Sequence, residues 1–446
     1  MTILHRAKSM LRSPLIRDVG VTWSGQVIGS GIGFCIGLLA QRQLGPADYG
    51  LLGLASSAGS LSSVLTDLGL SHAMVRFGSR DLAQHPERAA AQFAATFWCR
   101  MALTLLVSIV GCALAPWLAV ELFGKPQLSR PLQLVYACAG AGALYNYWQF
   151  YVQTIQRFAL RSLVQASLSV VKLGLFLSLM FSSSVTPLAM ILLDAGISLA
   201  AFCVGMRFAS PGLLKVPFSR VRKVTGELGR FARFSGLLLL GDMVFNEMDT
   251  LMLGMLSTDH VLGVYRCAWN YAMVLGFLNM SVSNVLFPKV SAVSDRVALR
   301  AFMGRIIRVG AFIGALTLPI VPLLYWWIPY YESAYAGAAG IFGLMYIGLV
   351  FELVVGPLQF VLYSLNRPGL LVANAGFKIA LHFVGNLLLI PIWGAYGAAT
   401  VTILTRVVGG VLVVYMIHRL LADRDVMAAG KPTLSSPRSE AVAAKK

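Results

Sequence analysis

Five basic side chains lie inside stretches of sequence that are otherwise long and apolar. They are Arg100, Lys172, Arg266, Lys378 and Arg406. A charged side chain at the centre of a membrane helix costs roughly 2.5–3.5 kcal/mol if it faces lipid. The five cations must therefore face a polar cavity or an acidic partner. Because Arg and Lys both bind phosphate, the set predicts a cavity that binds an anionic substrate, with phosphate as the favoured anion.

Polar residues accompany these cations at helical spacing. Gln92, Thr96 and Arg100 are each four residues apart, so they share one face of a helix. Three further sets have members three or four residues apart and so also share one face of a helix. They are Gln165, Ser169 and Lys172; Asp242, Asn246 and Asp249; and Asn374, Lys378 and His382. Both halves of the chain therefore contribute polar stripes to the predicted cavity.

Acidic residues also lie inside the apolar stretches. They are Asp194, Asp242, Glu247, Asp249 and Glu352. We interpret Asp194, Asp242, Asp249, Glu352 and His382 as candidates for coupling or gating. Each charge could instead belong to a structural ion pair, such as Arg266 with Asp242 or Asp249, and His382 could be a packed hydrogen-bonding residue. Both interpretations stay open.

Catalytic and metal-binding motifs do not occur in this sequence. It contains no HExxH, GxSxG or Walker A motif, and its six cysteines form no CxxC pair. No predicted outer loop is longer than about a dozen residues, which is short for an enzyme that acts on external substrates. We therefore expect binding and movement rather than catalysis, with no metal and no cofactor.

The composition indicates a membrane protein. Of the 446 residues, 57% are hydrophobic and 12% are charged, and the mean hydropathy is +0.75, whereas charged residues make up about 25% of a typical soluble domain. Apolar stretches recur along the chain and predict an all-α polytopic protein of about twelve transmembrane helices.

The basic residues predict the orientation. Most of the 36 Lys and Arg fall in alternate loops and at the two ends, and only Arg42, Lys125 and Arg130 fall on the opposite side. By the positive-inside rule, both termini lie in the cytoplasm of a multi-pass protein of the bacterial inner membrane. The net charge of +18 is then explained by anionic membrane lipids, and we expect no nucleic acid as a partner.

The two halves of the chain resemble each other. When Gly50 is aligned on Gly263, Ala55 falls on Ala268, again 213 residues later. Arg157 and Leu160 match Arg367 and Leu370 at an offset of 210. This similarity predicts two pseudo-symmetric six-helix lobes, with the substrate site between them.

The predicted lobes and connections have the following bounds. The N-terminal lobe covers 1–206 and the C-terminal lobe covers 234–421. A basic, amphipathic cytoplasmic linker covers 207–233. The Ala-, Ser- and Lys-rich segment 422–446 is predicted to be a disordered cytoplasmic tail.

Several of these segments resemble a known family. Gln43–Gly50, followed by Asp67–Leu70, is similar to the opening of Wzx-type polysaccharide flippases. The matching segments of the second half are Asp249–Gly254, Gly263–Tyr265 and Asn284–Lys289. The resemblance covers nearly the whole chain and indicates a polysaccharide transporter of the multidrug/oligosaccharidyl-lipid/polysaccharide (MOP) superfamily.

This resemblance implies two six-helix lobes around a V-shaped cavity. It also implies a function: a flippase that moves an undecaprenyl-pyrophosphate-linked oligosaccharide across the inner membrane by alternating access, for surface polysaccharide such as O-antigen or exopolysaccharide. A polysaccharide polymerase and a chain-length regulator are the candidate partners.

Two other functions compete with this one. The first is an ion-coupled exporter of drugs or metabolites from the same superfamily, and the second is a membrane polymerase or ligase for glycans. Lipid II flippases usually carry an Arg–Asp pair in the first helix, and multidrug antiporters tend to carry an acid there. The first predicted span, which includes Trp23, Ser24, Gln26 and Ser30, has no charge.

Overall fold

The computed structural model describes residues 14–210, 212, 216–291, 296–365 and 367–422. These residues form a series of helices, with no strand among them. The first six are α2 (Pro14–Asp67), α3 (Leu70–Gln84), α4 (Pro86–Trp117), α5 (Ser129–Thr154), α6 (Phe158–Phe181) and α7 (Pro187–Phe208). Then follow α8 (Phe218–Leu256), α9 (Asp259–Ser291), α10 (Arg296–Thr317), α11 (Ile320–Tyr331), α12 (Ala338–Val355), α13 (Gln359–Ser364), α14 (Pro368–Trp393) and α15 (Ala395–Ala422). The all-α class predicted from the sequence is confirmed.

Local sequence explains where several helices begin and bend. Pro86 and Pro187 stand at the first turns of α4 and α7, where a missing N–H is not needed. The Thr186 hydroxyl accepts a hydrogen bond from the Ala189 N–H at 3.2 Å and caps α7. α2 is bent at Gly45, whose φ of 72° is a left-handed value that glycine adopts without strain.

Nine helical stretches in the described residues are long and apolar enough to cross a membrane. The first of them has 43 residues, Gly25–Asp67, which at 1.5 Å per residue is about twice the thickness of a hydrocarbon core. Since Gly45 interrupts it, this stretch can hold two spans. α5 and α8 are long but less apolar, so a total of twelve spans stays a prediction.

Apolar side chains point outward from these helices. On α4, Leu105, Leu106 and Ile109 are between 58% and 62% exposed. Exposed apolar patches of this kind mark surfaces that contact a partner or a membrane. Their location on a helix that can span the bilayer indicates that they face lipid.

The chain divides into two compact units. The first contains the chain up to Tyr271, together with Trp327–Ile341 and Gly385–Ala398. The second contains Ala272–Trp326, Phe342–Val384 and the chain from Ala399 onward. The predicted lobe boundaries, 1–206 and 234–421, are a separate division based on sequence repeats, and they stay a prediction.

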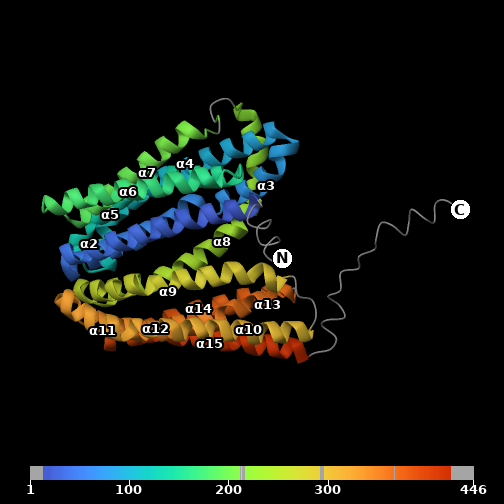
Figure 1. The fold of residues 1–446 in the computed structure, drawn as a ribbon. Helices are drawn as coiled ribbons and strands as arrows, with labels where there is room; N and C mark the ends of the chain where they lie inside the picture. Colours follow the sequence, from blue (N-terminus) through green and yellow to red (C-terminus); the bar gives the residue numbers. More distant parts are fainter. Residues whose placement is uncertain (1–13, 211, 213–215, 292–295, 366, 423–446) are drawn as a thin grey trace, which may run out of the picture. The chain divides into compact units, whose positions relative to one another are not determined.

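In the first unit (Figure 1), α5 packs against both α4 and α7, and α2 packs along α6. The core between α3, α4, α5 and α6 is built around Tyr147 and Trp148, both fully buried. The Trp148 indole N–H donates to the Ala209 carbonyl at 3.2 Å. In the second unit, α10, α13 and α15 share an apolar core that includes Ile306, Val361 and Ile417.

A close backbone approach in the first unit joins α2 to α9. A Cβ atom at Gly263 would overlap the carbonyl oxygen of Pro46, and a Cβ atom at Gly50 would overlap the carbonyl oxygen of Asp259. Gly50 and Gly263 are 213 residues apart, and so are Pro46 and Asp259. Each segment therefore makes the same contact with the other, which is the pattern that a twofold relation produces. This reciprocity supports the predicted internal duplication.

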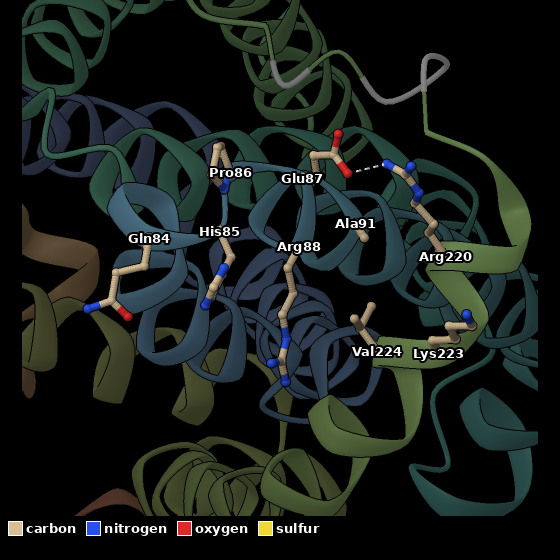
Figure 2. A pocket seen from close by; sticks show the side chains of 9 residues that line it. All are labelled: Gln84, His85, Pro86, Glu87, Arg88, Ala91, Arg220, Lys223 and Val224. Carbon is tan, nitrogen blue, oxygen red and sulfur yellow. Dashed lines mark hydrogen bonds and ion pairs between the residues drawn. The ribbon is translucent and has the colours of Figure 1, made fainter.

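The basic segment 218–233 forms the beginning of α8 rather than a separate element. Val221, Val224 and Leu228 pack against alanines of α3 and α4. Figure 2 shows Arg220 reaching Glu87 at the start of α4, an ion pair of 2.8 Å. The second half of the predicted linker is thus helical and docked on α3 and α4. The predicted tail, beyond Ala422, lies outside the described residues.

Replacing Gly263 by Ala should destabilise the protein, because the new methyl group would overlap backbone atoms. Overpacking of this kind costs about 1–3 kcal/mol. The melting temperature of the detergent-purified protein measures the effect. The matched control is Gly276→Ala in the same helix, where a Cβ atom would meet nothing within 4 Å; the control should melt at or above the wild-type temperature. Equal melting temperatures for both variants would contradict the reciprocal contact.

Asp81 gives a prediction for acid pH. Burial raises the pKa of this carboxyl group, but hydrogen bonds from Arg80 and Gln92 and the charges of Arg80 and Arg88 outweigh that effect and hold the pKa below its usual value. A carboxyl group with a lowered pKa in the folded state stabilises it above the unfolded-state pKa of about 4 and loses that contribution as the pH falls further. Asp81→Asn should therefore lower the melting temperature at pH 7 and have less effect at pH 3. Equal effects at both pH values would refute this role.

Candidate transport site

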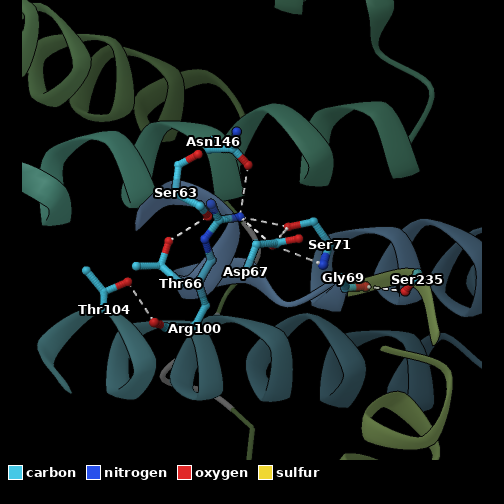
Figure 3. Close-up of polar contacts among 9 residues, drawn as sticks. All are labelled: Ser63, Thr66, Asp67, Gly69, Ser71, Arg100, Thr104, Asn146 and Ser235. Carbon is cyan, nitrogen blue, oxygen red and sulfur yellow. Dashed lines mark hydrogen bonds and ion pairs between the residues drawn. The ribbon is translucent and has the colours of Figure 1, made fainter. Parts of the chain in front are cut away.

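The most buried of the predicted cations is Arg100 on α4, which is 1% exposed. Its Nη1 lies 2.8 Å from Asp67 Oδ1, 2.7 Å from Ser71 Oγ and 2.9 Å from Asn146 Oδ1. Figure 3 shows the guanidinium directed at these groups, which come from the end of α2, the start of α3 and the middle of α5. The Arg100 charge is therefore shared among four helices of the first unit.

The turn that positions Asp67 depends on an unusual backbone. Leu68 has a φ of 44° and Gly69 a φ of 81°, so the helical backbone is interrupted between α2 and α3. The Asp67 carboxylate also accepts a hydrogen bond from the Ser71 N–H at 3.2 Å and thereby caps the first turn of α3. The DLGL segment thus brings an acid to Arg100.

One donor of Arg100 is unused. Its Nε is buried and has no hydrogen-bond partner among the described residues. A buried donor without a partner costs about 1–3 kcal/mol, and such groups are rare unless they serve a function. The Arg100 site is therefore a buried ion pair with one free donor.

Lys172 on α6 forms an ion pair with Asp194 on α7. The Lys172 side chain is 25% exposed and the Asp194 side chain 58%. This pair is far more accessible than the Arg100 pair. Because both side chains are partly exposed, the Lys172 ammonium can also contact a group from outside the protein.

Arg266 on α9 lies against α2. It is 213 residues after Gly53, and a Cβ atom at Gly53 would lie 2.9 Å from Arg266 Nε. Arg266 Nη1 is 3.5 Å from Thr250 Oγ1. The absence of a side chain at Gly53 thus makes room for Arg266.

The predicted stripe on α8 divides between surface and interior. Asp242 and Asn246 are exposed, and the Asn246 amide donates to the Asp242 backbone carbonyl at 2.8 Å. Asp249 is buried and accepts hydrogen bonds from the Tyr265 hydroxyl at 2.6 Å and the Asn386 amide at 2.7 Å. Of the three, Asp249 is held most firmly. Near it on the same helix, Glu247 accepts a hydrogen bond from Ser57 at 2.6 Å.

The second unit holds the other two cations. Arg406 on α15 forms an ion pair with Glu352 on α12, with side chains 13% and 34% exposed. On α14, Lys378 is half-buried, and its alkyl chain packs over Gly409 of α15. His382, on the same face of α14, is 2% exposed.

These positions can be compared with the expectations. Arg100, Lys172 and Arg406 each pair with an acid, as the structural alternative allowed, and Asp194 and Glu352 are two of those acids. A single cavity lined by all five cations stays a prediction, and so does each proposed role in binding, coupling or gating.

Two acids that bind buried polar groups, Asp67 and Glu332, were not among the candidates predicted from the sequence. Asp67 belongs to the DLGL motif, where its role as the Arg100 counterion has no local signal. Glu332 follows α11 and accepts two hydrogen bonds from the Gln41 amide, at 2.9 and 2.7 Å. Its partner is 291 residues away, and only a structure could show that contact.

Comparison with known proteins decides the family. The model of a family described as polysaccharide biosynthesis proteins matches residues 15–294, well over half of the chain. The chain belongs to this family. The family predicted from Gln43–Gly50 and Asp67–Leu70 is thereby confirmed.

Two relatives of the chain are named as probable flippases. The protein named "Probable flippase AglR" from Haloferax volcanii is 25% identical over 206 residues, which is 44% of this chain and 43% of the relative. The protein named "Probable low-salt glycan biosynthesis flippase Agl15" from the same organism is 23% identical over 223 residues, 47% of this chain and 44% of the relative. The matches thus span less than half the length of these curated relatives.

Solved transporter structures share the fold. The lipid II flippase MurJ aligns with a TM-score of 0.71 at 13% identity, over 90% of this chain and 87% of its own. A multidrug resistance MATE family transporter of the MOP superfamily aligns with a TM-score of 0.73 at 11% identity, over 92% and 99% of the two chains. The predicted superfamily fold is confirmed, and both neighbours are transport proteins rather than enzymes.

Replacing Arg100 by Gln should sharply reduce the amount of folded protein, because Asp67 would remain buried without its cation. Breaking a buried pair costs about 3–5 kcal/mol. Lys172→Gln is the matched control, and because the Lys172–Asp194 pair is accessible it should leave the amount of folded protein unchanged. Immunoblots and melting temperatures measure both effects.

The double variant Arg100→Gln/Asp67→Asn should recover much of the lost protein, since no uncompensated charge remains. Normal abundance of the single Arg100→Gln variant would show that the ion pair is not structural.

Proposed function

We propose that this protein is a flippase that moves a lipid-linked oligosaccharide, joined to its carrier through undecaprenyl pyrophosphate, across the bacterial inner membrane. The observation that carries the proposal is membership of the polysaccharide biosynthesis family in a chain with a transporter fold. The flippase names of the relatives support it. The product would be a surface polysaccharide such as O-antigen or exopolysaccharide.

The charges inside the helices fit such a substrate. A pyrophosphate group needs cations, and it can be bound and released only if those cations are not locked to their counterions. The Lys172–Asp194 pair meets this condition, since both side chains are accessible. In this mechanism Asp194 neutralises Lys172 when the site is empty, and the substrate phosphate replaces Asp194 when it is occupied.

Other cations differ in accessibility from Lys172. Arg406 is 13% exposed beside Glu352, and Lys378 is half-buried. We expect Lys172 and Lys378 to contact the phosphate, with Arg406 in support, and Arg100 to hold the helices together. Alternating access then moves the sugar and phosphate through the polar interior while the lipid chain stays in the bilayer. We also propose that both termini lie in the cytoplasm and that the protein contacts a polysaccharide polymerase and a chain-length regulator.

The fold is also compatible with a second function, that of an ion-coupled exporter, because a MATE transporter superposes as well as MurJ does. Such exporters move small molecules rather than lipid-linked glycans. The two functions predict different consequences when the gene is removed.

Deletion of the gene from its host should abolish the surface polysaccharide and leave lipid-linked repeat units in the cytoplasmic leaflet. Expression of the full chain should restore the polymer. Polysaccharide extraction and the accessibility of the lipid-linked sugar to an external lectin, in vesicles of defined orientation, measure these outcomes.

Drug susceptibility is the control, and it should not change. Normal polymer in a deletion strain that lacks any related gene would contradict the proposal, and a gain in drug susceptibility with normal polymer would favour the exporter.

A further inference from the structure

The first unit carries an apolar groove of about 620 Å³ along α8. Its walls come from the turn between α2 and α3, from α4 and from α8, and they include Leu68, Leu70, Leu103 and Leu240. Of the twelve residues that line it, only Cys99, Thr225 and Arg233 carry polar atoms in their side chains. Its volume lies in the range of ordinary ligand sites, but it offers few hydrogen-bond partners to a ligand.

Two glycines of α8 set the shape of the groove. A Cβ atom at Gly236 would overlap the carbonyl oxygen of Leu68, so this glycine brings α8 against the α2–α3 turn and closes one side. A Cβ atom at Gly229 would meet nothing within 4 Å. The groove is therefore open above Gly229, seven residues and about two helical turns from its closed side.

A positive charge stands at the rim of the groove. Arg233 lines it, is exposed and makes no ion pair within the described part of the chain. Arg222 precedes Arg233 by eleven residues and so projects from the same side of α8; it is also exposed. An occupant with an apolar chain and an anionic head would thus find complementary surfaces along this helix.

The groove and the Arg100 site share the turn between α2 and α3. Leu68 and Leu70 face the groove, whereas Asp67 and Ser71, from the same turn, bind Arg100 (Figure 3). The Ser235 hydroxyl donates to the Gly69 carbonyl at 3.4 Å and helps to hold α8 on this turn. A chain in the groove would therefore lie one turn of backbone away from a buried polar network.

We propose that, before transport, this groove holds the polyprenyl chain of the lipid-linked substrate, with the phosphate of that lipid at Arg233 until it passes to Lys172 and Lys378 and the chain returns to the bilayer. The inference rests on the proposed function, which supplies the class of lipid. Each isoprene unit carries a methyl branch, and the small residues Ala102, Gly229 and Ala232 leave recesses that such branches can fill. The charge of Arg233 selects a phosphorylated lipid over the free alcohol.

The probe that tests this groove is a polyprenyl phosphate with a diazirine on its isoprenoid chain. The full-length protein is placed in vesicles of phosphatidylethanolamine and phosphatidylglycerol, and cross-linked peptides are identified by mass spectrometry. Cross-links should fall on the peptides that contain Cys99–Leu103 and Gly229–Leu240. Unlabelled polyprenyl phosphate should remove them, and an equal excess of phosphatidylglycerol should not.

Gly229→Trp fills the groove and should lower cross-linking about tenfold or more, because it excludes two or more methylene groups of the chain. Gly226→Trp is the matched control. It also points into free space on α8 but does not line the groove, so its cross-linking should equal that of the wild type. Retention of probe by Gly229→Trp would overturn the proposal.

The role of the head group is tested with two further variants. Arg233→Gln should weaken binding of polyprenyl phosphate and leave binding of the uncharged polyprenol unchanged. Lys223→Gln, which removes an exposed charge of α8 away from the groove, should change neither. Equal effects of the two variants would refute a phosphate contact at Arg233.

Competition and transport separate this inference from the proposed function. Equal competition by phosphatidylglycerol would make the groove a site for ordinary phospholipid and overturn the proposal. Wild-type flipping by Gly229→Trp would reject the groove while the flippase function stands. Absence of flipping in the wild-type vesicles would instead reject the function itself, and the cross-links would still show whether the groove selects polyprenyl lipid.

Discussion

Backbone atoms from two distant segments touch at Gly50 and Gly263, and any side chain at either position would occupy space that a carbonyl oxygen already fills. This contact brings the bend of α2 against the start of α9. In the same region Arg266 lies over Gly53, and these two residues are also 213 positions apart. α2 and α9 also carry hydrogen-bond partners of nearby acids: Ser57 on α2 binds Glu247, and Tyr265 on α9 binds Asp249.

The membrane imposes the second constraint. Charges inside apolar helices need partners, and the structure supplies them in two forms. Arg100 is sealed among Asp67, Ser71 and Asn146, and such an arrangement stabilises helix packing. Lys172 stands beside an accessible Asp194, and such an arrangement can exchange its counterion. The accessibility of a pair, rather than its presence, therefore separates structural candidates from transport candidates.

Much of this architecture could be predicted from the sequence because its signals are local or periodic. The long apolar runs predicted helices, and the offset between Gly50 and Gly263 predicted a duplication that the contacts support. Partners such as Asp67 for Arg100 could not be predicted, because they depend on a turn with left-handed residues at Leu68 and Gly69. The groove along α8 was missed for a related reason: Gly229 and Gly236 look alike in the sequence, and only packing shows that one is open and the other closed.

The reciprocal glycine contact can form only after both of its segments have been synthesised. Gly50 leaves the ribosome 213 residues before Gly263, and at about 5–20 residues per second this separation corresponds to roughly 10–40 s. During that interval Gly50 lacks its partner on α9. A nascent chain that stalls between the two glycines would expose an unmatched backbone surface, which quality-control proteases and insertion chaperones could recognise.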